Sequence, residues 1–421
     1  MQEFNHPGWS NNTNIYEVNV RQYTPEGTFA AFQKHLPRLR DMGVEVLWFM
    51  PVTPISLEGR KGTLGSYYAV ADYKKVNPEF GSLEDFKCLL INAQEMGFKV
   101  IVDWVANHTG NDNVWIKSHP EYFEHEANGN IVHPNGWEDV SKLDYNNLEM
   151  QQAMIEAMEY WIEECNIDGF RCDMAHLVQL DFWIKAKASI SKLKPGLFWL
   201  AECEEPSYHE VFDATYTWKW MHASEEYFKK SISLGNLIDV LRHYDTDFHS
   251  SAFRAYFTSN HDENSWNGTE YEKYGDAVKL MAVFSCTWNG LPLIYSGQEL
   301  PNYKRLKFFD KDPIDWGVCT LHDFYKTLLN LRKLIPVLNA GDPSVSSTII
   351  ATAYPDQLFI FKRNTSVEEA IIILNFSATQ LQFNSPFIGS YADVFKAQKL
   401  EFDSGSTFIL EPWGYQILKR Q

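Results

Sequence analysis

Short apolar runs alternate with amphipathic segments along the first 335 residues of the chain. Runs of four to seven apolar residues are typical of buried strands, and apolar residues spaced three and four apart are typical of helices. Seven runs are predicted as strands, and a weaker eighth lies near residues 213–216. The seven are residues 15–20, 44–50, 100–105, 169–172, 198–201, 255–258 and 293–295. This alternation predicts a parallel α/β fold.

Three of the intervening segments carry clear helical signals, at residues 29–39, 82–97 and 150–161. The first places Phe29, Phe32, Leu36 and Leu39 at helical spacing. The second opens with a capping box formed by Ser82 and Asp85, and the third repeats Met every fourth position. Helices of this kind cover the outside of a parallel sheet.

The parallel sheet can close into a (β/α)₈ TIM barrel or stay open as a doubly wound sheet. Two features favour the barrel. The strand count is eight, and polar residues follow the ends of many different strands. In a barrel those carboxyl ends converge on one face, whereas an open sheet has its site at one switch point.

Two regions depart from the alternation. Residues 108–146 lack helical periodicity and predict a short inserted subdomain B after the third strand. From residue 336 the pattern changes to short alternating runs, which predict a C-terminal antiparallel β-sandwich over residues 336–421. Its predicted strands are 348–353, 358–363, 370–375, 381–383, 407–410 and 415–419. The predicted barrel comprises residues 1–107 and 147–335.

Net charge and composition limit the classes of molecule that the protein is expected to bind. The 421 residues include 37 Lys and Arg against 55 Asp and Glu, a net charge of −18. A negative field repels nucleic acid and anionic lipid but not a neutral polymer, so no nucleic-acid partner is expected. Aromatic residues make up 15% of the chain, which suits stacking on sugar rings as well as core packing.

Compartment signals are few. The start of the chain has neither a basic segment nor an apolar core, so it contains no signal peptide, and no stretch is long enough to span a membrane. A cytoplasmic location is expected, or a secreted or periplasmic one if a leader was removed. The six cysteines lack CxxC spacing and imply no disulfide framework, and Cys172 and Cys203 are predicted to be buried thiols.

Four segments at predicted strand ends carry the candidate chemistry. They are DWVANH at 103–108, GFRCDMAH at 169–176, WLAE at 199–202 and FTSNHDEN at 257–264. Together they place three carboxylates, two His and one Arg on one barrel face. Cleavage of a glycosidic bond needs two carboxyl groups in different protonation states.

The local sequence predicts how those two states arise. Asp173 follows Arg171 by two residues, so both side chains point to the same side of a strand and the guanidinium favours an ionised Asp173. Glu202 has apolar neighbours, which raise a carboxyl pKa by desolvation and suit a proton donor. Asp262, between His261 and Glu263, can accept hydrogen bonds from sugar hydroxyls.

In order and placement these segments resemble the motifs of the α-amylase family (glycoside hydrolase family 13), over nearly the whole chain. The resemblance implies that Asp173 is the nucleophile, Glu202 the general acid/base and Asp262 the transition-state stabiliser. The implied substrate-binding residues are Tyr68, His108, Arg171, His176 and His261, with structural support from Asp103 and Asn107. The family is retaining, so the two carboxyl groups are expected about 5–5.5 Å apart.

The sequence departs from the family at its usual calcium site. Asn107 fits the first ligand, but Lys142 stands where an Asp ligand is expected and Leu177 where a ligand His often stands. Calcium takes 6–8 oxygen ligands, and an ammonium group repels a cation. No metal or other cofactor is therefore expected, and we hypothesise that Lys142 or a hydrogen-bond network replaces the ion.

The leading hypothesis is retaining hydrolysis of α-1,4-glucosidic bonds in starch, maltodextrins or related α-glucans by a monomer. An α-1,6-glucosidase or a glucan transglycosylase would use the same carboxylates. A non-catalytic carbohydrate-binding relative is the remote alternative, because such relatives usually lack one of the three carboxylates.

Two tryptophans have open roles. Trp137 can be a sugar platform or a small-domain core residue, and Trp413 has no second Trp beside it in the sequence.

Overall fold

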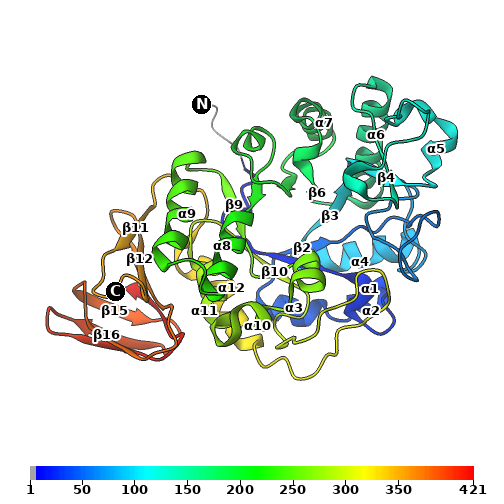
Figure 1. Cartoon of the computed structure of the whole chain (residues 1–421). Helices are drawn as coiled ribbons and strands as arrows, with labels where there is room; N and C mark the ends of the chain where they lie inside the picture. Colours follow the sequence, from blue (N-terminus) through cyan, green and yellow to red (C-terminus); the bar gives the residue numbers. More distant parts are fainter. Residues whose placement is uncertain (1–5) are drawn as a thin grey trace.

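The computed structural model describes residues 6–421, and a closed barrel of eight parallel strands forms its larger part (Figure 1). The order around the barrel is β1-β10-β9-β8-β7-β6-β3-β2. The strands are β1 Ile15–Val18, β2 Val46–Phe49, β3 Lys99–Val105, β6 Gly169–Asp173, β7 Phe198–Ala201, β8 Ala214–Tyr216, β9 Phe253–Tyr256 and β10 Leu291–Tyr295. The predicted (β/α)₈ barrel is confirmed, and the doubly wound alternative is wrong.

Alternation along the strands decides what fills the barrel. Ile15, Ile101 and Leu200 belong to one cluster of buried residues inside it. Successive strand residues point to opposite faces, so the residue two positions later also faces inward. Those residues are polar: Glu17, Asp103 and Glu202. The interior is therefore apolar at its amino end and charged at its carboxyl end.

Helices cover the outside of the barrel. They are α4 Leu83–Glu95, α6 Leu148–Cys165, α7 Leu180–Leu193, α8 Trp218–Phe228, α9 Leu234–Asp247, α10 Glu270–Tyr274, α11 Val278–Thr287 and α12 His322–Leu334. The predicted capping box starts α4, because Ser82 accepts from the Asp85 N–H and Asp85 from the Ser82 N–H. Helix α6 buries Met150, Met154 and Met158 on one face, as predicted.

The helical segment predicted at residues 29–39 is two short helices, not one. Helix α2 covers Phe29–Gln33 and α3 covers Leu36–Met42, after the short α1 at Val20–Tyr23. Pro37 lies in the first turn of α3. Proline has no N–H to donate to the carbonyl four residues earlier, so it starts a new helix and does not continue the old one.

Residues 108–146 form a small substructure beside the barrel (Figure 1, cyan). Strand β4, His108–Gly110, pairs antiparallel with β5, Val140–Lys142, and the short helix α5, Val114–Ser118, lies between them in the chain. Trp137 packs against a small buried cluster of Ile55, Ala69 and Val140. Loops from both the insertion and the barrel therefore share this cluster.

The C-terminal region is a two-layered antiparallel structure. A six-stranded sheet in the order β11-β12-β13-β18-β15-β16 faces the pair β14-β17 across a shared apolar cluster. The strands are β11 Ser346–Ile350, β12 Leu358–Asn364, β13 Glu369–Asn375, β14 Leu381–Asn384, β15 Gly389–Asp393, β16 Gln398–Phe402, β17 Thr407–Leu410 and β18 Tyr415–Arg420. Sequence patterns missed β15 and β16, because few of their side chains are buried.

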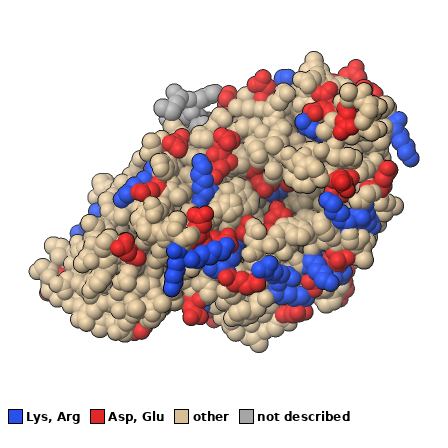
Figure 2. Space-filling model, in the orientation of Figure 1, with Lys and Arg blue, Asp and Glu red and all other residues tan. Residues whose placement is uncertain are grey.

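No helix within residues 6–421 is both long enough and apolar enough to cross a bilayer. Basic and acidic side chains are intermingled on the face shown in Figure 2. All six cysteines are unpaired thiols, and Cys172 and Cys203 are buried as predicted.

Candidate active site at the carboxyl end of the barrel

A cavity of about 340 Å³ is lined by five of the ten predicted site residues. Its walls include Asp173, Glu202, Asp262, Tyr68 and His108. A larger cavity of about 670 Å³ lies where α8 and α10 meet the C-terminal sheet, and none of the three carboxylates lines it. The smaller cavity is therefore the candidate active site, because the three carboxylates line it.

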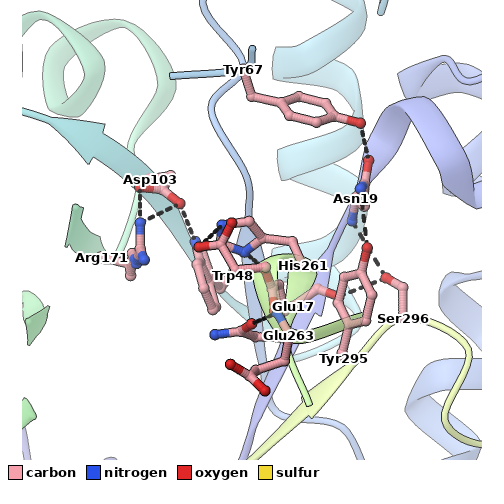
Figure 3. A network of polar contacts seen from close by, with 12 residues as sticks. Glu17, Asn19, Trp48, Tyr67, Asp103, Arg171, His261, Glu263, Tyr295 and Ser296 are labelled. Atoms are coloured by element: carbon pink, nitrogen blue, oxygen red, sulfur yellow. Dashed lines mark hydrogen bonds and ion pairs between the residues drawn. The ribbon is translucent and has the colours of Figure 1, made fainter. Parts of the chain in front are cut away.

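Arg171 joins three carboxylates behind this cavity. Its Nη1 lies 2.9 Å from Asp103 Oδ1 and 3.2 Å from Asp173 Oδ1, and its Nη2 lies 2.7 Å from Glu202 Oε2. The side chain is completely buried. Figure 3 shows the Asp103–Arg171 pair, which aligns neighbouring residues of β3 and β6. The contact between Arg171 and Asp173 that the sequence predicted is present, and a shorter contact with Glu202, which the sequence did not indicate, accompanies it.

The two hydrogen bonds that hold the Glu202 side chain both end on one carboxylate oxygen, Oε2. Besides Arg171, the backbone N–H of Met174 donates to Oε2 of Glu202 at 3.0 Å. Met174 has φ of 40°, in the left-handed region that non-glycine residues avoid. Backbone strain of this kind concentrates at functional sites, and here it turns an N–H toward a catalytic candidate. Oε1 remains free to carry a proton.

The charge state of Asp173 differs from the sequence expectation. Burial and the nearby Glu202 carboxylate raise the pKa of Asp173 well above its usual range, and this outweighs the lowering by Arg171. Arg171 lowers this pKa, as the sequence predicted, but it does not determine the net direction. Two adjacent carboxyl groups titrate as a pair, so a proton on Glu202 removes one of the causes that raise the pKa of Asp173 and favours the Asp173 anion.

Tyr68, His261 and Asp262 form the opposite side of the site. The Tyr68 ring stacks on His261 at 5.3 Å, and its hydroxyl lies 2.8 Å from His261 Nε2. The Tyr68 hydroxyl also donates to Asp103 at 3.0 Å. Partial burial would raise the pKa of Asp262, but His261, 3.3 Å away, outweighs it and lowers that pKa. Asp262 is therefore an anion facing the cavity.

The remaining predicted residues separate into two groups. His108 is buried in the cavity wall, and burial lowers its pKa to about 4, which keeps the imidazole neutral. Asn107 is buried next to it and donates from Nδ2 to His108 Nδ1 at 3.2 Å. His176 is exposed and is not among the residues that line the cavity. The structure does not bring His176 together with the others.

Comparison with known proteins assigns the family. The model of the α-amylase catalytic domain matches residues 6–315, well over half of the chain. The chain belongs to the α-amylase family. An α-amylase structure from Lactobacillus plantarum is 30% identical, covers 98% of this chain and 99% of its own, and superposes with a TM-score of 0.87.

Two further relatives extend this comparison. A noncanonic maltogenic α-amylase from Thermotoga neapolitana is 29% identical over 97% of this chain and 99% of its own, with a TM-score of 0.89. A cyclomaltodextrinase of Thermoanaerobacter pseudethanolicus is 27% identical, and the match covers 90% of this chain and 69% of that protein.

Aromatic residues that sequence reasoning missed complete the wall of this α-amylase-family site. They are Trp266, Phe308 and Phe309. Trp266 is 52% exposed and its ring lies 5.5 Å from Phe308, which in turn stacks 6.3 Å from Tyr68. Trp266 lies on the short π-helix Glu263–Asn267, and Phe308 and Phe309 lie on an irregular segment, so no periodicity marks them. The one available signal is that Trp266 follows Asp262 by four residues, which does not distinguish it from other aromatics.

The residues at the family's calcium position do not fit the ion. Lys142 Nζ forms an ion pair with Glu124 at 2.9 Å, and the Asn107 carbonyl accepts the backbone N–H of Leu143 at 3.2 Å. Within residues 6–421 no three His, Cys, Asp or Glu side chains form a group that could hold a metal. Calcium needs 6–8 oxygen ligands. We derive no step of the chemistry through a metal.

Proposed function

We propose that this protein hydrolyses α-1,4-glucosidic bonds of maltodextrins and related α-glucans with retention of configuration. The observation that carries the proposal is the single buried guanidinium of Arg171, which contacts both Asp173 and Glu202 at the wall of one cavity. A shared guanidinium places both carboxyl groups at one cavity wall, as attack by one and proton donation by the other require. An inverting enzyme needs a separation of about 6.5–9.5 Å to place a water between them, so the anomeric configuration of the first product distinguishes the two mechanisms.

The first step forms a covalent intermediate. A carboxylate oxygen of Asp173 attacks the anomeric carbon of the bound glucose unit, and the bond to the glycosidic oxygen breaks. That oxygen takes the proton held on Oε1 of Glu202, since Oε2 is occupied by Arg171 and the Met174 N–H. The products are a glucosyl ester of Asp173, a Glu202 carboxylate and a shortened glucan.

The second step reverses the proton transfer. The Glu202 carboxylate removes a proton from water, whose oxygen attacks the anomeric carbon and displaces Asp173. Two inversions return the α configuration. Asp262 faces the sugar as an anion, and hydrogen bonds to ring hydroxyls are its role in favouring the distorted, positively charged transition state. Neutral His108 and the Tyr68 ring hold the same sugar by contact.

Product analysis of two carboxamide variants tests these roles. Glu202→Gln should lower kcat on maltooligosaccharides and soluble starch by about 10²–10⁴-fold, because the amide cannot donate a carboxylic proton. Asp173→Asn should form no glucosyl ester. Pullulan and isomaltose in the same assay separate α-1,6 from α-1,4 cleavage, and proton NMR of the first product reports its anomeric configuration.

The matched control is Glu204→Gln. Glu204 lies two residues further along the chain, accepts from the backbone N–H of Lys219 at 3.1 Å, and does not line the cavity. Its variant should keep near-normal turnover. Only a few-fold loss in Glu202→Gln, or a β-anomeric first product, would rule out the mechanism.

Transglycosylation is a second candidate, favoured by one feature of the cavity. Trp266 presents a half-exposed aromatic face beside Asp262, where a sugar acceptor can stack. An acceptor sugar would then compete with water for the intermediate. Incubation with concentrated maltotriose decides it, because transfer yields products longer than the substrate and hydrolysis does not.

A further inference from the structure

Glu17 is a buried carboxylate inside the barrel to which the catalytic steps above give no role. Its side chain is completely buried on β1, and Oε1 lies 2.5 Å from Nδ1 of His261 (Figure 3). Its second oxygen, Oε2, has no hydrogen-bond partner within residues 6–421. A buried carboxylate anion is costly unless an opposite charge compensates it. His261 is the group that Glu17 contacts for this purpose.

The other ring nitrogen of His261 faces the site. Nε2 lies 2.8 Å from the Tyr68 hydroxyl and 3.3 Å from Oδ2 of Asp262. An ionised carboxylate can only accept, so Nε2 must carry a hydrogen to bond Asp262. His261 thus has a carboxylate at each ring nitrogen. The imidazolium, with hydrogens on both nitrogens, is the form that satisfies both contacts.

Groups from several strands surround this pair. The charged and titratable ones are Glu17 on β1, Tyr68 before α4, Asp103 on β3, Arg171 on β6, Tyr216 on β8, Tyr295 on β10 and Asp262 after β9. Burial lowers the pKa of His261, but the carboxylates of Asp262 and Glu17 outweigh it and raise that pKa well above its usual range. Burial raises the pKa of Glu17 in spite of His261 and Arg171, so the two groups hold one shared proton tightly.

We propose that Glu17 is a positioning residue that fixes the His261 ring and keeps it as an imidazolium directly behind Tyr68 and Asp262 in the wall of the sugar-binding cavity. The inference rests on the proposed function, because it assigns the Nε2–H of His261 to the bound glucose and to Asp262. Trp48 braces the ring from the side, with centroids 6.0 Å apart and a T-shaped orientation. Glu17 thereby acts through His261 and not on the sugar itself.

A purely structural ion pair would give a different result from a positioning one. Loss of a structural pair lowers stability but leaves the pH dependence of catalysis where it is. Loss of the positioning charge lowers the pKa of His261 and changes the pH at which the imidazolium disappears. The pH profile therefore separates the two roles.

The first measurement is a ¹⁵N NMR titration of histidine side chains, with His261→Gln to assign the signal. In the unaltered protein His261 should keep its imidazolium shifts to a pH well above the ordinary titration midpoint of histidine. In Glu17→Gln, which keeps the shape but removes the charge, the midpoint should fall into the range below that pH. The measurement needs no substrate, so it remains decisive even if glucan hydrolysis is not observed.

The second measurement is the pH profile of kcat and KM on maltotriose. The imidazolium is present below the pKa of His261 and lost above it. A lower pKa should therefore move the basic limb of the kcat–pH profile of Glu17→Gln to lower pH, by about one unit. We expect kcat to fall about tenfold or more, the usual effect of an outer-layer partner, with a smaller change in KM. Glu17→Asp retains the charge and should restore the limb but not the full rate.

The matched control is Glu299→Gln. Glu299 is equally buried and accepts from Tyr16 at 2.8 Å, and its partner cation is Arg38. It does not line the cavity. Its variant should lose stability without moving the basic limb. The inference is overturned if His261 titrates near its ordinary pKa in the unaltered protein, if Glu17→Gln leaves the limb in place, or if Glu299→Gln moves it equally.

Discussion

Asp173 and Glu202 show that the protonation of two adjacent carboxyl groups depends on their neighbours in space. Local sequence supplies each carboxyl with different flanks, yet the same Arg171 contacts both. Burial and mutual repulsion raise the pKa of Asp173, so its ionisation depends on where the shared proton lies. With the proton on Glu202, both groups are in the states that the proposed mechanism requires.

This coupling predicts the behaviour of Glu202→Gln on α-maltosyl fluoride. Fluoride leaves without a proton, so the variant can still form the maltosyl ester of Asp173. The amide is uncharged, as a protonated Glu202 is, so Asp173 should ionise over the same pH range and the acid limb of the kcat/KM profile should stay in place. Stopped-flow fluoride release across the pH range measures this limb. A shift of the acid limb to lower pH would show that Glu202 is charged while Asp173 titrates, and would contradict the coupling.

At the scale of elements, the β4–β5 hairpin stabilises the insertion through its own contacts. Lys142 on β5 pairs with Glu124, and Leu143 just after β5 donates its N–H to Asn107 just after β3. Both contacts lie at the residues that the family resemblance matches to a calcium site. A hydrogen bond between neutral backbone groups thus joins the insertion to the barrel, and a partly exposed ion pair links two segments within the insertion.

From this arrangement we predict that removal of divalent metal leaves stability unchanged. Excess EDTA should not shift the Tm in differential scanning calorimetry, and added calcium should not raise it. Lys142→Ala should change the free energy of unfolding by less than about 1 kcal/mol, the usual value of an exposed pair. A Tm that falls with chelator and recovers with calcium would show that the ion binds after all.

The whole molecule consists of a catalytic barrel and a C-terminal sheet joined around aromatic residues. Trp413, between β17 and β18, has its ring 5.5 Å from Phe228 of α8. Its φ of 55° is strained for a non-glycine residue, and its N–H donates to the Ser377 carbonyl at 3.0 Å. The ring borders the larger cavity, which Tyr274 of α10 also lines. The structure thus pairs Trp413 with aromatics of the barrel that are remote in sequence.

We expect Trp413→Ala to destabilise the protein without impairing the site. Loss of the half-buried ring should lower the free energy of unfolding by about 1–3 kcal/mol, less than for a fully buried Trp. Trp413→Phe should retain most of it. Values of kcat/KM on maltotriose should stay within about twofold, because the cavity that holds the carboxylates is a separate one. A parallel loss of kcat/KM would instead connect this junction to catalysis.

Sequence alone determined the eight barrel strands, the insertion after β3 and the short list of carboxylates. Buried parallel strands must be apolar along their length, and a side chain after a strand end is recognisable wherever the chain folds. The same reasoning missed β15 and β16, whose partly exposed residues carry no apolar alternation. It also joined α2 and α3, because apolar spacing continued across Pro37.

Tertiary structure decided everything that depends on distance. Closure of the barrel brings Glu17, near the start of the chain, to His261, and it lets one guanidinium reach carboxylates on three strands. Coulomb interactions and desolvation act through space and fall off over a few ångström, so charge states follow the packing and not the order of residues. The sequence determines residue types and periodicity, whereas the protonation states of the site arise only after folding has brought the strands together.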